Sequence, residues 1–132
     1  MNYKGLNEYI RENRNKRFKF CEHDCLTFTN EVWEILYGYK WSDDWLGRYK
    51  AWSRPEDLKT EYGFDSLEDA IDSKLTRVNH VPPRGALILS GKTRHWSTGK
   101  SMGIAVGDSG LFLGRAGMVN LPIEDFHMGW VE

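Results

Sequence analysis

Cys21 and Cys25 are the residues best suited to chemistry in this sequence, and Asp24 stands directly before the second of them. Asp is a preferred N-cap residue, and the apolar residues that follow recur at helical spacing, so we expect a helix to begin at Asp24. Cys25 then lies in the first turn, where unpaired backbone N–H groups and the helix dipole stabilise a thiolate. This position favours the thiolate form that a nucleophilic cysteine needs. Most unpaired cysteines, however, are small buried apolar residues, and spacing alone favours this second interpretation of Cys25.

The helix that carries Cys25 is the clearest element of the chain. Between residues 24 and 37 apolar residues recur every three or four positions, and Gly38 follows at the place of a left-handed C-cap. The apolar face is wide, which predicts a central helix. A shorter amphipathic helix is expected over residues 6–13, and Ser66 is placed to cap another that begins at the next residue.

The hydrophobic period changes after residue 80. Short apolar runs separated by Gly-rich turns predict antiparallel strands over residues 85–90, 102–107, 111–113, 118–121 and 127–131. A chain of 132 residues has the size of one domain. We therefore predict a single α+β domain over residues 1–132, mainly helical over 1–80 and an antiparallel β-meander over 81–132.

Charge and cysteine content exclude several classes of function. The 18 Lys and Arg nearly balance the 19 Asp and Glu, so no bulk field attracts nucleic acid or anionic lipid. The basic stretch at residues 11–19 has Glu8, Glu12 and Glu22 around it and is expected to be a solvated face. No apolar run approaches the ~20 residues of a membrane span. Cys21 and Cys25 are too few and too close for a disulfide framework, and both are expected to be reduced.

Several segments resemble, in order, a family of small phage and prophage tail-region proteins related to the NlpC-type cysteine peptidases. They comprise residues 18–28, 46–49, 63–64, 84–88 and 102–107 and the closing Trp130. The most specific pieces are the Asp24-Cys25 helix start and the Met-Gly-Ile-x-Val-Gly run at residues 102–107. The resemblance covers the chain from about Phe18 to its end. It implies a papain-like fold, with the cysteine-bearing helix packed on the C-terminal β-meander.

The same resemblance assigns roles to individual residues and shows one departure. In NlpC-type enzymes the helix-start cysteine attacks an amide, a histidine opening the second strand is the base, and a polar residue on the next strand orients it. Cys25 takes the nucleophile position after the N-cap Asp24, but Ser101 stands in the histidine position and apolar Leu113 at or beside the third. Without imidazole, a thiol of pKa ~8.5 is only a few per cent thiolate at neutral pH, and nothing protonates the leaving amine. His95, in the loop before Ser101, is the substitute base to consider.

The resemblance and the missing histidine together predict a structural component of the phage tail tip, or a tail-assembly protein, on a degenerate peptidase scaffold. The alternative is an active cysteine peptidase or amidase that cleaves peptidoglycan peptides during delivery of the phage genome. A host-directed binding module is a third possibility. We expect synthesis in the host cytoplasm, a place in the virion tail, and other tail proteins as partners, with peptidoglycan as the substrate under the alternative.

No cofactor or metal is expected, and one aromatic segment is expected to make contacts. Cys21, His23 and Cys25 are not accompanied by the second ligand pair that structural zinc sites normally have. Trp41, Trp45 and Trp52 do not fit one face of a helix or strand. At least one of these rings is therefore predicted to be exposed and to anchor a partner.

Overall fold

The protein is described by a computed structural model that covers residues 1–19, 22–46, 60, 62–91, 101–126 and 128–132. The α-helices are α1 (Tyr3–Asn13), α2 (Cys25–Tyr37) and α4 (Leu67–Asp72), with short 3-10 helices η1 (Asp43–Trp45) and η3 (Ile123–Asp125). The strands are β1 (Thr76–Val78), β2 (Leu87–Ser90), β3 (Ser101–Ala105), β4 (Ser109–Gly114), β5 (Gly117–Pro122) and β6 (Met128–Val131).

The strands form one antiparallel sheet of six strands in the order β1-β6-β2-β3-β4-β5. Strands β2 to β5 make the expected meander, so the α+β prediction is confirmed. The last strand, however, returns to the other side of β2, where Leu87 faces Trp130. Strand β1 then pairs with β6 and extends the sheet.

Strand β1 is not among the strands that the sequence pattern predicts. Its three residues follow the end of α4 closely and carry no turn signal of their own. Their strand conformation depends on pairing with β6, in which Thr76 faces Val131. A pairing partner more than 50 residues away leaves no periodicity in the local sequence, which is why the pattern missed this strand.

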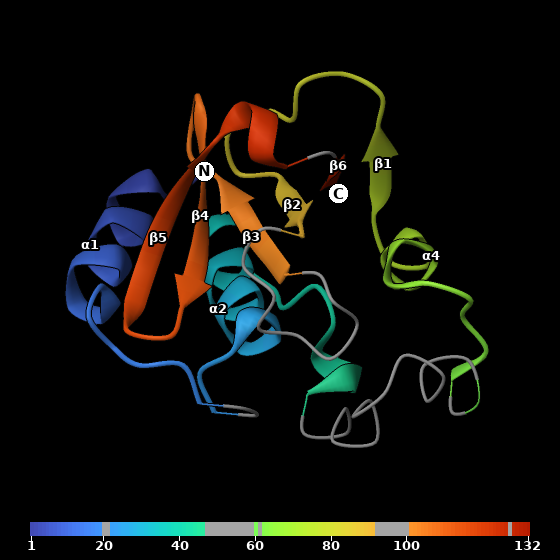
Figure 1. Cartoon of the computed structure of the whole chain (residues 1–132), viewed down its shortest axis with the longest axis horizontal. Helices are drawn as coiled ribbons and strands as arrows, with labels where there is room; N and C mark the ends of the chain where they lie inside the picture. Colours follow the sequence, from blue (N-terminus) through green and yellow to red (C-terminus); the bar gives the residue numbers. More distant parts are fainter. Residues whose placement is uncertain (20–21, 47–59, 61, 92–100, 127) are drawn as a thin grey trace.

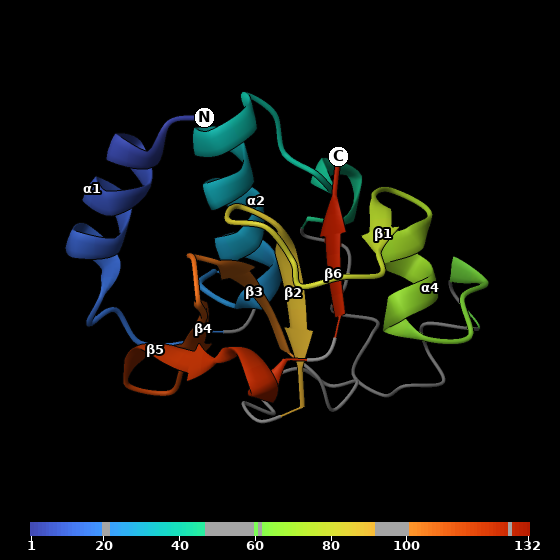
Figure 2. The same ribbon diagram turned by 90° about the horizontal axis from the view of Figure 1, so that it is seen from above.

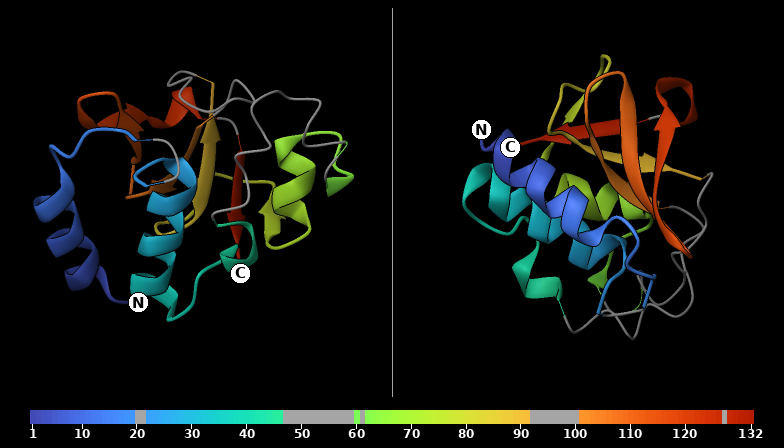
Figure 3. Two further views of the ribbon diagram at one scale, coloured as in Figure 1. Left: turned by 90° about the horizontal axis from the view of Figure 1, so that it is seen from below. Right: turned by 90° about the vertical axis from the view of Figure 1, so that its left-hand side faces the viewer.

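Helices α1 and α2 lie side by side on one face of the sheet, and α4 lies beside β1 at its far end (Figures 1 and 2). The main core fills the space between α2 and the sheet, and it includes Leu26, Phe28, Leu89 and Ile104. A smaller core on the opposite face, under η3, is built around Phe112 and Phe126. The end view in Figure 3 shows both helices against the curved sheet.

The caps explain where the helices begin and end. Gly38 has φ +88°, and its N–H donates to the carbonyl of Glu34, so α2 ends as predicted. Ser66 accepts the N–H of Asp69 at 3.1 Å and starts α4 at the expected residue. Helix α1 begins at Tyr3, earlier than predicted, because Asn2 caps it through the N–H of Gly5.

A buried polar network holds the chain that follows α2 and determines where its tryptophans lie. The Trp41 indole N–H donates to Thr29 Oγ1 at 3.1 Å, and Asn30 exchanges hydrogen bonds with Ser42. Trp41 and Trp45 are both buried and meet edge to face at 5.5 Å. The predicted exposed ring is therefore neither of these two, and Trp52 lies outside the described residues.

Candidate functional site

Asp24 starts helix α2 and thereby sets the position of the cysteine. Its fully buried carboxylate accepts the N–H groups of Leu26 at 3.1 Å and Thr27 at 3.0 Å. The Thr27 hydroxyl returns the interaction by accepting the N–H of Asp24 at 2.8 Å, which completes a capping box. Cys25 is the first residue of the helix, as the sequence predicted.

The Cys25 thiol is enclosed by the core. It is 2% exposed and packs in the cluster between α2 and the sheet. Burial raises the pKa of the thiol well above its ordinary value, and the hydrogen bond from the backbone N–H of Met102 only partly offsets that rise. The Asp24 charge raises the pKa further, and the N–H groups of Cys25 and Leu26 lower it slightly. The helix start is therefore present, but its effect on the thiol is outweighed by burial.

The pairing of β3 explains why the Met102 N–H is available to sulfur. The Ala105 N–H donates to the carbonyl of Ala86, on the β2 side. Successive residues of a strand direct their N–H groups to opposite sides, so Met102 directs its own toward β4. The pairing of β3 with β4, however, covers only Ile104 and Ala105. The Met102 N–H therefore points past the paired part of β4, and it lowers the pKa of the Cys25 thiol.

Ser101 does not face Cys25. Met102 and Ile104 belong to the same core cluster as Cys25, whereas Ala105 belongs to the cluster on the other face. By strand alternation, Ser101 shares the face of Ala105, and its cross-strand neighbour Ser90 bonds the carbonyl of Asp125 in η3 on that same face. The side chains of Cys25 and Ser101 therefore lie on opposite faces of the sheet, whereas a cysteine peptidase would need the groups at these two positions to meet.

The strand positions that do face the core of Cys25 carry apolar side chains. Met102 is fully buried and Leu113, the third position of the resemblance, is 2% exposed in the same cluster. Neither side chain can accept or donate a proton. The alternation of small residues at 101, 103 and 105 with large residues at 102 and 104 was the sequence signal for this orientation.

His23 is the described imidazole nearest to Cys25 in sequence, and it is buried with 1% exposure. Its backbone bridges to Lys19, and its Nε2 atom has no hydrogen-bond partner in the described part of the chain. Burial, with the charge of Lys16, lowers the pKa of His23, against the smaller opposing effects of Glu31 and Asp24. His23 is therefore neutral at neutral pH, and no hydrophobic period around it indicates that it is buried.

Other residues considered from the sequence are placed as follows. His80 is exposed between β1 and β2, with Nδ1 2.8 Å from the carbonyl oxygen of Val81. Cys21, His95 and His127 lie outside the described residues. Within the described ranges, no three His, Cys, Asp or Glu side chains gather as metal ligands. None of the helices in this part of the chain has the length and apolar character needed to cross a bilayer.

These features define an α+β protein in which a cysteine at a helix start is buried against a six-stranded antiparallel sheet. A family model described as "Domain of unknown function (DUF6950)" matches residues 2–131, and the chain belongs to that family. No curated protein matches the sequence significantly.

Proposed function

We propose that this protein is a structural or assembly component of a phage tail, built on an NlpC-like cysteine peptidase scaffold that has lost its catalytic machinery. The proposal combines the sequence resemblance with the geometry around Cys25. The observation that carries the loss of catalysis is the enclosed thiol, which lies in the same core cluster as the apolar side chains of Met102 and Leu113. A thiol in such surroundings stays protonated and does not meet a substrate.

The arrangement of the elements supports descent from a papain-like peptidase. A capped helix begins with the cysteine and packs against the strand that carries the Met-Gly-Ile run. In this position the cysteine has a structural use, because its side chain fills part of the core between α2 and the sheet. A residue can therefore be retained at a former nucleophile position for folding alone.

The competing function is an active cysteine hydrolase of cell-wall peptides. The backbone N–H groups of Met102, Cys25 and Leu26 each lower the pKa of the thiol and so favour a thiolate. Burial opposes them more strongly, and the strand face toward Cys25 offers no base at Met102 or Leu113. These observations favour the structural role over the hydrolase.

A genetic test follows from the two functions. In a prophage that carries this gene, deletion is expected to give particles with incomplete tails, and plasmid-borne wild-type protein should restore them. The Cys25→Ala protein should restore infectivity to within about twofold, because the loss of one buried sulfur atom costs far less free energy than typical proteins have in stability.

Two results would contradict the proposal. One is that the deletion strain makes complete, infectious particles and that mass spectrometry does not detect the chain in particles from the wild-type strain. The other is a Cys25→Ala protein that accumulates to the wild-type level and yet fails to restore infection. Cys25→Ser serves as the matched variant, because its hydroxyl can still accept the Met102 N–H.

A further inference from the structure

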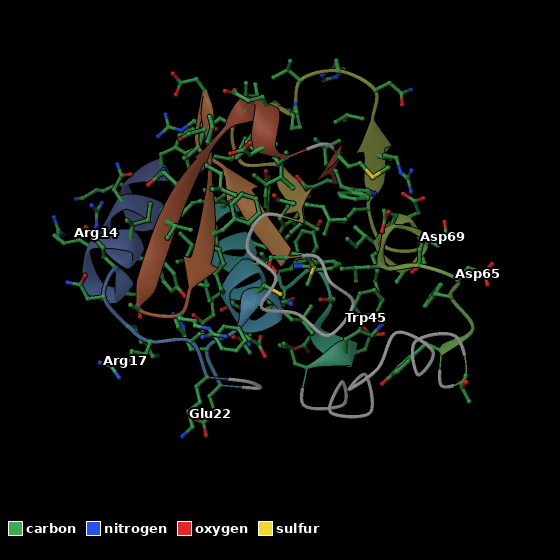
Figure 4. The ribbon with its side chains drawn as sticks, viewed as in Figure 1. Arg14, Arg17, Glu22, Trp45, Asp65 and Asp69 are labelled. Atoms are coloured by element: carbon green, nitrogen blue, oxygen red, sulfur yellow. The ribbon has the colours of Figure 1, made fainter. Side chains whose placement is uncertain are left out.

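The last turn of α1, the segment that follows it and the β4–β5 turn carry a set of cations, which we call the basic end. It consists of Arg11, Arg14, Lys16, Arg17 and Arg115, all of them exposed. Arg14 and Arg17 lie at this end, opposite Asp69 in α4 and Asp65 just before it (Figure 4). The charges of a nearly neutral chain are therefore distributed unevenly along the length of the molecule.

The side chains of the basic end have no ion-pair or hydrogen-bond partner among the described residues, unlike other cations of the protein. Lys19 pairs with Glu22 at 2.9 Å, Lys74 with Asp44 at 2.6 Å, and Arg77 with Asp72 at 2.6 Å. Cations that neither bond to their neighbours nor support the core are available to an external anion.

The fold holds this cluster in place through backbone contacts. The segment after α1 runs against the β4–β5 turn, where the Met118 N–H donates to the carbonyl of Arg14 at 2.8 Å and the Phe18 N–H to that of Arg115 at 3.4 Å. Gly117, at φ +146°, permits the approach, since a Cβ there would lie 2.5 Å from the Arg14 oxygen. Arg115 is thus brought beside Arg14 from the far end of the sequence.

Two neighbouring hollows at the basic end are lined in part by apolar residues. One, of about 220 Å³, is lined by Arg14, Arg115, Met118 and Val119 among others. The other, of about 110 Å³, lies between α1 and the sheet and shares Arg14 and Met118 with the first, with Ile10 on its wall. Arg14 and Arg115 therefore stand at hollows that also present apolar side chains.

We propose that the basic end is a docking surface for an acidic segment of a partner protein, one in which carboxylates flank an apolar side chain. Carboxylates complement the free guanidinium groups, and the apolar side chain enters a recess between Arg14 and Met118. A nucleic acid fits less well, because none of the described residues that line the two hollows has an aromatic ring on which a base could stack. The Tyr9 ring, which could stack on a base, instead packs on Phe28. This surface is independent of whether Cys25 is catalytic.

The test uses fluorescence anisotropy to measure how tightly the full chain binds a fluorescein-labelled peptide made of repeated Glu-Glu-Leu units. A peptide with Gln for Glu controls for charge, and oligo-deoxythymidine of equal length for nucleic acid. We expect the Glu peptide alone to bind, and Arg17→Glu with Arg115→Glu to weaken binding at least about tenfold. Both side chains are exposed, and the backbone contacts remain in the variant.

The matched control is Lys4→Glu with Lys40→Glu, which changes the net charge equally at residues outside the basic end. It should change the affinity by less than about twofold. The Arg17→Ala and Arg115→Ala pair gives a second measurement that places no new anions on the surface. The proposal would be overturned if the arginine-to-glutamate and lysine-to-glutamate variants lost equal affinity for the peptide. It would also be overturned if the protein bound the Gln peptide as tightly as the Glu peptide, or the oligonucleotide more tightly than either.

Discussion

Replacing Asp24 by Ala should destabilise the protein more than a typical helix-cap change. An N-cap replacement by Ala usually costs about 0.5–2 kcal/mol. Here the carboxylate is fully buried and accepts the N–H groups of Leu26 and Thr27, and a buried donor left unpaired costs about 1–3 kcal/mol. Because Cys25 and its bond to Met102 depend on the same helix start, we expect a loss of about 2–3 kcal/mol in the free energy of unfolding.

The assay is urea unfolding followed by tryptophan fluorescence and by far-UV circular dichroism. Asp24→Asn is the matched variant, since its amide oxygen can still accept both N–H groups, and it should lose about 1 kcal/mol or less. The dependence on urea concentration should stay the same, because the surface exposed on unfolding does not change. A loss below about 0.5 kcal/mol for Asp24→Ala, or equal losses for both variants, would refute the role assigned to this carboxylate.

Three further predictions concern other buried groups. In a Cys21→Ser background, iodoacetamide should alkylate Cys25 at least about a hundredfold more slowly in the folded protein than in urea, as followed by mass spectrometry, because burial keeps the thiol protonated and enclosed. Asp72→Asn should lower the melting temperature at neutral pH, since Asp72 accepts the Trp130 indole N–H at 2.7 Å. Partial burial opposes ionisation of Asp72, but the hydrogen bonds that it accepts hold its pKa below the ordinary value. The decrease in melting temperature caused by Asp72→Asn should therefore become smaller as the pH falls through that lowered pKa. The pKa of His23 is likewise lowered, so protonation favours the unfolded state, and His23→Phe should flatten the fall in unfolding free energy between pH 7 and 5.

The features that could be predicted from the sequence are local. The start of α2 depends on Asp24 and its end on Gly38, and both signals act within one turn of the helix. The cap at Ser66 and the meander of β2 to β5 follow from the same kind of short-range information. Cys25 could therefore be placed in the first turn before its surroundings were known.

The environment of Cys25 could not be predicted in the same way, because it depends on register. Whether Ser101 or Met102 faces α2 is decided by the pairing of β3 with β2, and a shift of one residue would exchange them. The hydrogen bond from Met102 to sulfur also requires that the β3–β4 pairing stop at Ile104. Neither condition is encoded in the residues next to Cys25.

The loss of catalysis is tested most directly by incubating purified wild-type and Cys25→Ala proteins with peptidoglycan sacculi and with synthetic stem peptides. Released fragments are identified by mass spectrometry, and a bacterial cell-wall amidase serves as the positive control. A general base typically contributes about 10²–10⁴-fold to the rate, and a buried protonated thiol lowers it further, so we expect no fragments above the blank from either protein. Fragments released by the wild-type protein, and absent with Cys25→Ala, would contradict this account.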